Sequence, residues 1–165
     1  SDVQIRDILQ GQNRKLSVRS IAQYRIEMGI QPAKRRISGY KYPPLSANFS
    51  LLYPLTVVSV RTNSHAGPGI YEFRLKNREI EYHNGKTPVI YIGSTGNIKK
   101  RLRDHLGKNT KNGRIRDFLK NHECFFRYIR FSKDWNKEEA IMYKLFFNTY
   151  GAQPKCNRIK PGIKK

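Results

Sequence analysis

Two short apolar runs in the middle of the chain do most to limit what it can fold into. Residues 70–75 (IYEFRL) and 89–94 (VIYIGS) have the length and composition of β-strands. The segment between them contains Asn84-Gly85, a dipeptide that favours the tight turns of hairpins. The pattern therefore predicts two paired strands, and the rest of the fold has to be built around that pair.

Three helices and a third strand are expected after this pair. The first helix is marked by Asn97 as a capping residue and by apolar residues at positions 98, 102 and 106. The third strand is marked by alternating side chains. The expected ranges are 98–106, 113–122 and 136–150 for the helices and 124–132 for the strand. The chain is thus expected to have a mixed α/β fold of the α+β type.

The amino-terminal part of the chain divides into two segments of different composition. Residues 1–38 predict two short helices, the second starting after Ser17. Two helices separated by a short break, with basic residues on the second, are the layout of a helix-turn-helix. Residues 39–66 contain many prolines and glycines and are expected to form a linker, in which LTVVSV (55–60) predicts a lead-in strand.

The net charge is the most informative global property of the chain. Lysine and arginine number 33 against 12 aspartates and glutamates, a formal charge of +21. A compact domain with this charge repels itself, and a polyanionic partner would relieve the repulsion. The basic residues are spread over the whole chain, whereas a membrane-surface protein gathers them in an amphipathic helix or beside an anchor. The charge therefore favours a nucleic acid as the partner.

Neither a membrane span nor a secretion signal is predicted. No apolar run reaches the roughly 18 residues that a membrane-spanning helix needs, and the chain does not open on a charged and then apolar leader. Cys124 and Cys156 are far apart and lack metal-ligand spacing, which favours free thiols in a reducing compartment. We therefore expect an intracellular protein, cytoplasmic or associated with the nucleoid, and not a secreted one.

Four side chains around the strand pair indicate phosphate chemistry. Tyr71 and Tyr91 are expected on one face of the pair, although aromatic residues there are also typical of ordinary core packing. Arg101 and His105 are one helical turn apart, at the edge of the apolar stripe of their helix. A guanidinium suits phosphate oxygens, and a phenol or an imidazole can move a proton.

Glu139 on the last expected helix is the candidate metal ligand. At 100° per residue it falls near the middle of the apolar face, where a carboxylate is costly unless it is paired or bound to a metal. Glu138 lies well off that face. The alternative is that Asn136 caps the helix, in which case Glu139 occupies the capping-box position and bonds only to the backbone.

An ordered set of residues in the second part of the chain resembles the GIY-YIG nuclease family. The resemblance covers about residues 68–158. It implies a small three-stranded antiparallel sheet flanked by helices, and hydrolysis of DNA phosphodiester bonds with one divalent cation, Mg²⁺ or Mn²⁺. The residues that carry the resemblance are Gly69-Ile70-Tyr71, Tyr91-Ile92-Gly93, Arg101, His105, a later helical glutamate and PKCN ending at Asn157.

The same resemblance implies a role for each of these side chains. Residues 67–165 would form the nuclease domain and its basic tail, and Glu138 would be the alternative to Glu139. The implied roles are proton acceptor for Tyr71, second active-site tyrosine for Tyr91, phosphate stabilisation for Arg101 with His105 beside it, metal ligand for Glu139 and closure of the site for Asn157.

Residues 1–36 resemble the helix-turn-helix of the nitrogen-class sigma factor, with SVRSIAQYR in place of its RpoN box. In that family the second helix reads a major groove of DNA; a plain helical lid with a basic surface is the alternative here. The residues expected to contact DNA are Arg19, Ser20, Gln23, Tyr24, Arg25, Lys34, Arg35, Arg36 and, unless they only form a solvated basic face, Lys99, Lys100 and Arg103.

Together these patterns predict a metal-dependent DNA endonuclease that a helix-turn-helix delivers to double-stranded DNA, in restriction, homing, repair or a mobile element. With one site per chain, a homodimer would make cleavage of both strands easier. One alternative is a DNA-binding regulator with a degenerate nuclease domain. Another is an RNA-binding protein that stacks bases on tyrosine and phenylalanine.

Overall fold

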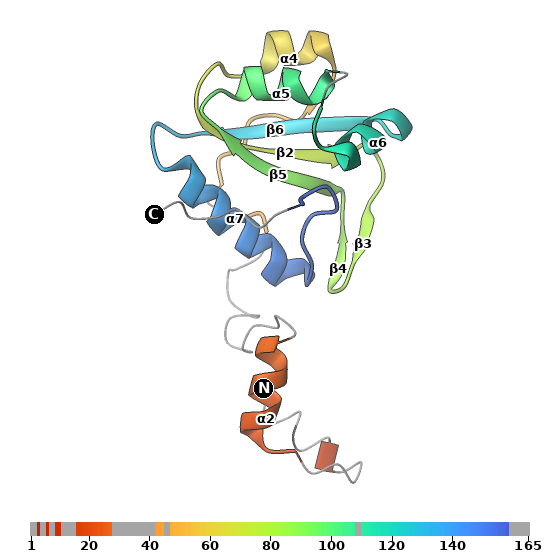
Figure 1. Ribbon diagram of the computed structural model, residues 1–165, viewed down its shortest axis with the longest axis vertical. Helices are drawn as coiled ribbons and strands as arrows, with labels where there is room; N and C mark the ends of the chain where they lie inside the picture. The colour runs from red at the N-terminus through yellow and green to blue at the C-terminus, as the bar shows by residue number, and fades with distance from the viewer. Residues whose placement is uncertain are drawn as a thin grey trace.

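The computed structural model describes residues 3, 6, 9, 10, 16–27, 42–44, 47–107 and 110–158 (Figure 1). These residues form a mixed structure of helices and strands, which confirms the predicted class. The elements in chain order are α2 (Val18–Glu27), β1 (Tyr53–Pro54), α4 (Val57–Asn63), β2 (Gly69–Leu75), β3 (Ile80–Tyr82), β4 (Gly85–Thr87), β5 (Val89–Thr95), α5 (Ile98–Leu106), α6 (Gly113–Asn121), β6 (Cys124–Arg130) and α7 (Trp135–Tyr150).

The main sheet is antiparallel and has four strands in the order β1-β6-β2-β5. The predicted three-stranded sheet is one strand short, because the two residues of β1 are too few to leave a sequence pattern. β3 and β4 form a separate hairpin inside the segment predicted as a loop, with His83 and Asn84 at its turn and Gly85 as the first residue of β4. β2 is central and β5 is an edge strand, a position that matters for the site.

Helices cover both faces of the sheet (Figure 1). On one face, α4, α5 and α6 contribute Val60, Ile98 and Ile115 to an apolar cluster, and none of these three side chains is exposed. On the other face, α7 contributes Met142 and Phe146 to a second cluster. Each such side chain stabilises the fold by about 1.5–3 kcal/mol when it is fully buried. The sheet is therefore held between two apolar layers.

The predicted strand at LTVVSV is wrong, because residues 57–63 form the helix α4. Thr56 begins the helix, and its hydroxyl accepts a hydrogen bond from Ser59 N at 3.2 Å. Val57 and Val58 face solvent, whereas Val60 is fully buried in the cluster under α5. A cap and one buried contact thus override the β-propensity of the valines, which is a weak and context-dependent preference.

The segment before β1 lies against the sheet and is attached to it by polar contacts. The Tyr42 hydroxyl donates to the carboxylate of Glu72, a fully buried residue of β2. The backbone N–H of Ser50 donates to Tyr128 O at 2.8 Å, and its Oγ accepts from Tyr128 N at 3.0 Å. Arg127 donates to Glu72 at 2.6 Å and stacks over Phe49. Part of the predicted linker therefore belongs to the packed structure.

The helix α2 confirms the predicted start of the second amino-terminal helix. Ser17 Oγ accepts a hydrogen bond from Ser20 N at 3.0 Å, as a capping residue does. Arg19, Gln23 and Tyr24 are exposed on α2. The break between the two predicted helices, the side chain of Arg25, and residues 34–36 lie outside the described residues, so the helix-turn-helix stays a prediction. Within the described ranges, no helix is long and apolar enough to cross a membrane.

Candidate active site

The pairing of β2 with β5 places the two tyrosines on one face of the sheet. Tyr71 lies opposite Gly93, and Phe73 lies opposite Tyr91, so all four residues share the face covered by α5. The Tyr71 and Tyr91 ring centroids are 5.8 Å apart. Tyr71 is fully buried and Tyr91 is partly buried. The predicted juxtaposition of the two phenols is confirmed.

A β-bulge changes the position of one isoleucine. The register between β2 and β5 shifts after Phe73, which leaves Ile90 as an extra residue in β5. Ile70 and Ile92 lie in the cluster under α7, as expected from strict alternation, but Ile90 lies in the cluster with Tyr71. Strict alternation would place every isoleucine of the two strands opposite the tyrosines, and the bulge makes Ile90 the exception.

Steric constraints explain the glycines of the two motif triplets, Gly69-Ile70-Tyr71 and Tyr91-Ile92-Gly93. A Cβ atom on Gly93 would be 2.9 Å from the Tyr71 hydroxyl oxygen and 2.8 Å from the Tyr91 ring. A Cβ atom on Gly69 would overlap the carbonyl oxygen of Ile129 on the neighbouring strand. Gly93 therefore leaves the space that the Tyr71 ring occupies, and Gly69 lets β2 and β6 approach each other.

The helix α5 brings His105 to the tyrosines. Asn97 caps the helix as predicted, since its Oδ1 accepts from Lys100 N at 2.9 Å. His105 is 4% exposed, and its Nε2 is 2.8 Å from the Tyr71 hydroxyl. Its ring contacts those of Phe73 and Tyr91 at centroid distances of 5.2 and 5.5 Å. The imidazole is thus enclosed by three aromatic rings.

Arg101 lies one turn before His105 and acts on both phenols. Its side chain is exposed at the edge of the apolar stripe, yet its guanidinium lowers the pKa of each tyrosine by charge and hydrogen bonding. Burial acts in the opposite direction and more strongly, so the pKa of Tyr71 stays well above its usual value. The pKa of Tyr91 is also raised, again by burial. Both phenols are therefore neutral at pH 7.

Glu139 approaches the site from α7, on the other side of the edge strand. Ser94 Oγ donates to Glu139 Oε2 at 2.6 Å and lies 3.1 Å from Asn136 Oδ1. Burial raises the pKa of Glu139, whereas the Ser94 hydrogen bonds and the charge of Arg101 lower it. The charge of Glu139 in turn raises the pKa of Tyr91. The carboxylate is therefore within electrostatic reach of the guanidinium and of one phenol.

The capping-box alternative for Glu139 is wrong. The residue that precedes α7 is Asp134, in a left-handed backbone conformation with φ 57° and without a side-chain capping bond. Glu139 is then one residue beyond the first turn, too far along the helix for a capping box. Glu139 reaches β5 through its hydrogen bond with Ser94.

The comparison with protein families agrees with this arrangement. A model of the GIY-YIG catalytic domain matches residues 68–151, slightly more than half of the chain. The chain belongs to the GIY-YIG family. No curated protein and no solved structure matched it. GIY-YIG domains are nuclease domains, so this chain carries an enzyme domain that acts on nucleic acid.

Asn157, which lies outside the matched residues, supports the edge strand of the GIY-YIG domain. Its Nδ2 donates to Ile92 O at 2.8 Å, and its Oδ1 accepts from Ile92 N at 3.0 Å. Cys156 N donates to Ile90 O at 2.8 Å. These bonds satisfy the outward-facing backbone groups on both sides of Tyr91. The buried amide thus holds Tyr91 in position, and its two polar atoms are already engaged.

Ser94 is the site residue that the sequence reasoning missed. It directly follows the second triplet, and strand alternation places it on the α7 face, opposite to Tyr91. Because β5 is an edge strand, a helix can approach Ser94 from one face while α5 approaches Tyr91 from the other. Strand alternation therefore indicates which face Ser94 occupies, but it identifies Ser94 as a site residue only once the position of α7 is known.

The residues present fit a hydrated divalent cation. The donors near β5 are oxygen atoms, namely one Glu139 carboxylate with Ser94 and Asn136 beside it. Mg²⁺ prefers oxygen ligands, keeps several waters and is commonly held by one or two carboxylates. Among the described residues, no group of three or more His, Cys, Asp or Glu side chains could hold a metal. The set thus suits a weakly chelated Mg²⁺ better than a zinc site.

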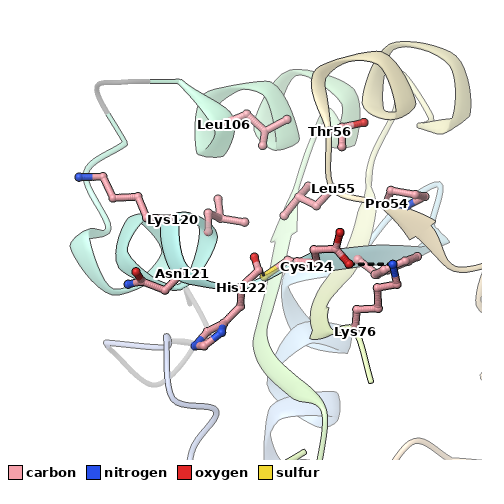
Figure 2. A pocket seen from close by; sticks show the side chains of 12 residues that line it. Pro54, Leu55, Thr56, Lys76, Leu106, Lys120, Asn121, His122 and Cys124 are labelled. Atoms are coloured by element: carbon pink, nitrogen blue, oxygen red, sulfur yellow. Dashed lines mark hydrogen bonds and ion pairs between the residues drawn. The ribbon is translucent and has the colours of Figure 1, made fainter. Parts of the chain in front are cut away.

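A separate cavity of about 580 Å³ lies away from these residues (Figure 2). It is lined by residues of β1, α5, α6 and β6, including Leu106 and Cys124, and by Leu55, which follows β1. The ion pair between Lys76 and Glu123, at 2.7 Å, lies at its side. Its lining contains none of the predicted catalytic side chains.

Burial of His105 predicts a specific loss of stability in acid. Burial, helped by the charge of Arg101, lowers the pKa of His105 from 6.5 to about 3. The unfolded chain therefore takes up a proton below pH 6.5 that the folded chain refuses until about pH 3. The contribution of His105 to the free energy of unfolding is therefore fully present above pH 6.5. Below that pH it falls by about 1.4 kcal/mol per pH unit.

The test is urea denaturation of the wild type and of His105→Gln at pH 7 and pH 4.5. Between pH 7 and pH 4.5 the free energy of unfolding should fall by about 2–3 kcal/mol more in the wild type than in the variant. Carboxylates titrate in both proteins, so their contribution cancels in the comparison. Equal losses in the two proteins would show that His105 is not held neutral in the fold.

Proposed function

We propose that the protein is a metal-dependent endonuclease that hydrolyses phosphodiester bonds in double-stranded DNA. The observation that carries the proposal is the convergence of two phenols, a guanidinium, an imidazole and a carboxylate around the edge strand β5. The net charge of +21 supports a polyanionic substrate. Family membership supports a nucleic acid as that substrate.

Arg101 would bind the scissile phosphate. Its guanidinium is at the surface and beside both phenols, so it can donate two parallel hydrogen bonds to phosphate oxygens. The same charge would stabilise the additional negative charge of the transition state. Glu139 would hold a Mg²⁺ or Mn²⁺ ion, which when bound supplies a Lewis acid for the phosphate and stabilises the leaving oxygen.

Tyr71 would accept the proton of the attacking water. It can do so as the phenolate, and the positive charges of Arg101 and of a bound cation would have to favour that form, because burial keeps the phenol neutral in the free protein. His105 Nε2 is 2.8 Å from the Tyr71 hydroxyl. Because His105 is held neutral, the tautomer with an unprotonated Nε2 would accept a hydrogen bond from this hydroxyl and orient it. Tyr91, which is partly exposed, would orient the phosphate together with Arg101.

The amino-terminal segment would target the domain to DNA as a helix-turn-helix. The capped helix α2 with exposed Arg19, Gln23 and Tyr24 supports this role, because such side chains contact bases and phosphates in a major groove. Dimerisation on DNA would bring two sites to opposite strands. The biological setting, whether restriction, homing, repair or transposition, would follow from the sequence that the segment recognises.

Incubation with supercoiled plasmid tests the proposed function. The protein should convert the plasmid to nicked or linear forms in Mg²⁺, and EDTA should abolish the conversion. Binding to a labelled duplex should persist in EDTA. Binding without cleavage in Mg²⁺ or Mn²⁺ would instead favour a DNA-binding regulator with an inactive domain.

A further inference from the structure

A groove of about 810 Å³ continues from the candidate site along α5. α5 forms one wall, and residues 110–112 together with Arg158 form the other. Arg101 and His105 belong both to the candidate site and to this groove, so the two are continuous. We name it the α5 groove, and its positively charged lining residues are Lys100, Arg101, Arg103, Lys111 and Arg158.

The charge of the α5 groove is not neutralised from within the protein. Asp104 is the one acidic residue in its lining. Among the residues that the structure describes, no cation of the groove forms an ion pair, whereas several cations elsewhere are paired with carboxylates. The paired cations are Arg74, Lys76, Lys86, Arg127 and Lys137. The groove therefore presents its positive charge to an external anion.

The far wall of the groove is held in place by hydrogen bonds to the segment that supports β5. Arg158 Nη1 donates to Lys111 O at 3.3 Å. Asn112 Nδ2 donates to Cys156 O at 2.8 Å, and Asn112 Oδ1 also caps α6. Asn157, next to Arg158, is bonded to Ile92. The Arg158 side chain and the backbone of Lys111 thus have a defined position relative to Tyr91.

The dimensions of the groove suit a nucleic-acid strand better than a small anion. α5 has nine residues, and at 1.5 Å per residue it is about 13 Å long. One strand of B-DNA advances about 3.4 Å per nucleotide along the helix axis, so α5 spans roughly three to four nucleotides. The three cations on α5 lie within residues 100–103, and Lys111 and Arg158 lie on the opposite wall, so the lining can contact more than one phosphate of a strand.

We infer that the α5 groove binds the phosphates next to the scissile phosphodiester, on one side of it, in the strand that is cut. Arg101 contacts the scissile phosphate, and Arg103, Lys111 and Arg158 contact those that follow it in one direction. The inference rests on the proposed function, and it adds Lys111 and Arg158 to the DNA contacts. It also gives the cleaved strand a direction across the domain, from Arg101 toward Lys111 and Arg158.

Binding measurements with Glu139→Gln, which separates binding from cleavage, test the α5 groove. The comparison is between that protein and the same protein with Lys111→Gln and Arg158→Gln, on a fluorescent duplex over a range of salt concentrations. Each lost phosphate contact should reduce the slope of log affinity against log salt by about 0.9, so the pair should reduce it by about 1.8. Lys76→Gln combined with Lys86→Gln, which removes the same number of charges outside the groove, should leave the slope unchanged.

Single methylphosphonates in the duplex locate the contacts. A neutral linkage on one flank of the cut site should weaken binding by the parent protein and have little effect on the Lys111/Arg158 variant. An equal loss of affinity in both proteins, or an unchanged salt slope, would show that the α5 groove does not bind these phosphates. If the double variant unfolds, Arg103→Gln provides the same test from the exposed face of α5. These experiments measure binding and not cleavage. The proposal for the α5 groove can therefore be contradicted while plasmid nicking is observed, or supported while nicking is not observed.

Discussion

Glu139→Gln is expected to bind duplex DNA with nearly unchanged affinity and to cut it at least 1,000-fold more slowly. The amide has the shape of the carboxylate, and its oxygen can still accept the hydrogen bond from Ser94 that measures 2.6 Å. The position of α7 against β5 is therefore preserved. The change removes the charge that would hold the cation, and a 1,000-fold loss corresponds to about 4 kcal/mol of transition-state stabilisation.

Single-turnover cleavage of an end-labelled duplex in Mg²⁺ measures this effect, and anisotropy measures binding. Glu138→Gln is the matched control, because it changes the same charge one residue earlier on the same helix. It should cut at close to the wild-type rate. The assignment would have to move to Glu138 if the two variants exchanged behaviour, and the metal hypothesis would fail if both were fully active.

Arg101→Lys should reduce the cleavage rate by about 100- to 1,000-fold while it keeps the positive charge. The planar guanidinium can hold two phosphate oxygens and contact both phenols, whereas an ammonium is a single point of charge. Loss of one donor aimed at a developing oxyanion costs 100- to 1,000-fold in other enzymes, which sets the size of the effect. Binding should weaken by less than about tenfold, since the other cations of the α5 groove remain.

The measurement is again a single-turnover rate, with saturating protein so that weaker binding does not contribute. Arg116→Lys is the control, because Arg116 is exposed on the neighbouring helix α6 and outside the site. A rate within a factor of two of the wild type in Arg101→Lys would mean that charge alone matters at this position. The fork-like contact with the phosphate would then be discarded.

The elements with strong local signals could be predicted from the sequence. Asn97 caps α5 as its position indicates, and the alternation along β2 and β5 places Tyr71 and Tyr91 on one face. Helical spacing likewise identifies Leu102 as fully buried. These predictions need only a cap, a period and a turn, and each of them acts within a few residues of the chain.

The remaining features depend on contacts between distant segments. α4 forms because Val60 is buried under α5, which the local valine-rich pattern cannot show. The role of Ser94 depends on α7, which begins about 40 residues later, and Arg158 joins the groove wall through Lys111. Local propensity is a weak guide wherever tertiary packing decides the outcome. The chemistry of the site is thus readable in the sequence, but its supporting contacts are not.

The attachment of residues 42–44 and 47–54 to the sheet has a practical consequence for work on isolated fragments. A fragment trimmed to the matched boundary at residue 68 would remove the Tyr42 hydroxyl from the carboxylate of Glu72, immediately after Tyr71 in sequence. It would also strip Ser50 and β1 from β6 and leave that strand as a bare edge, which invites aggregation. Recombinant fragments should therefore begin upstream of residue 42.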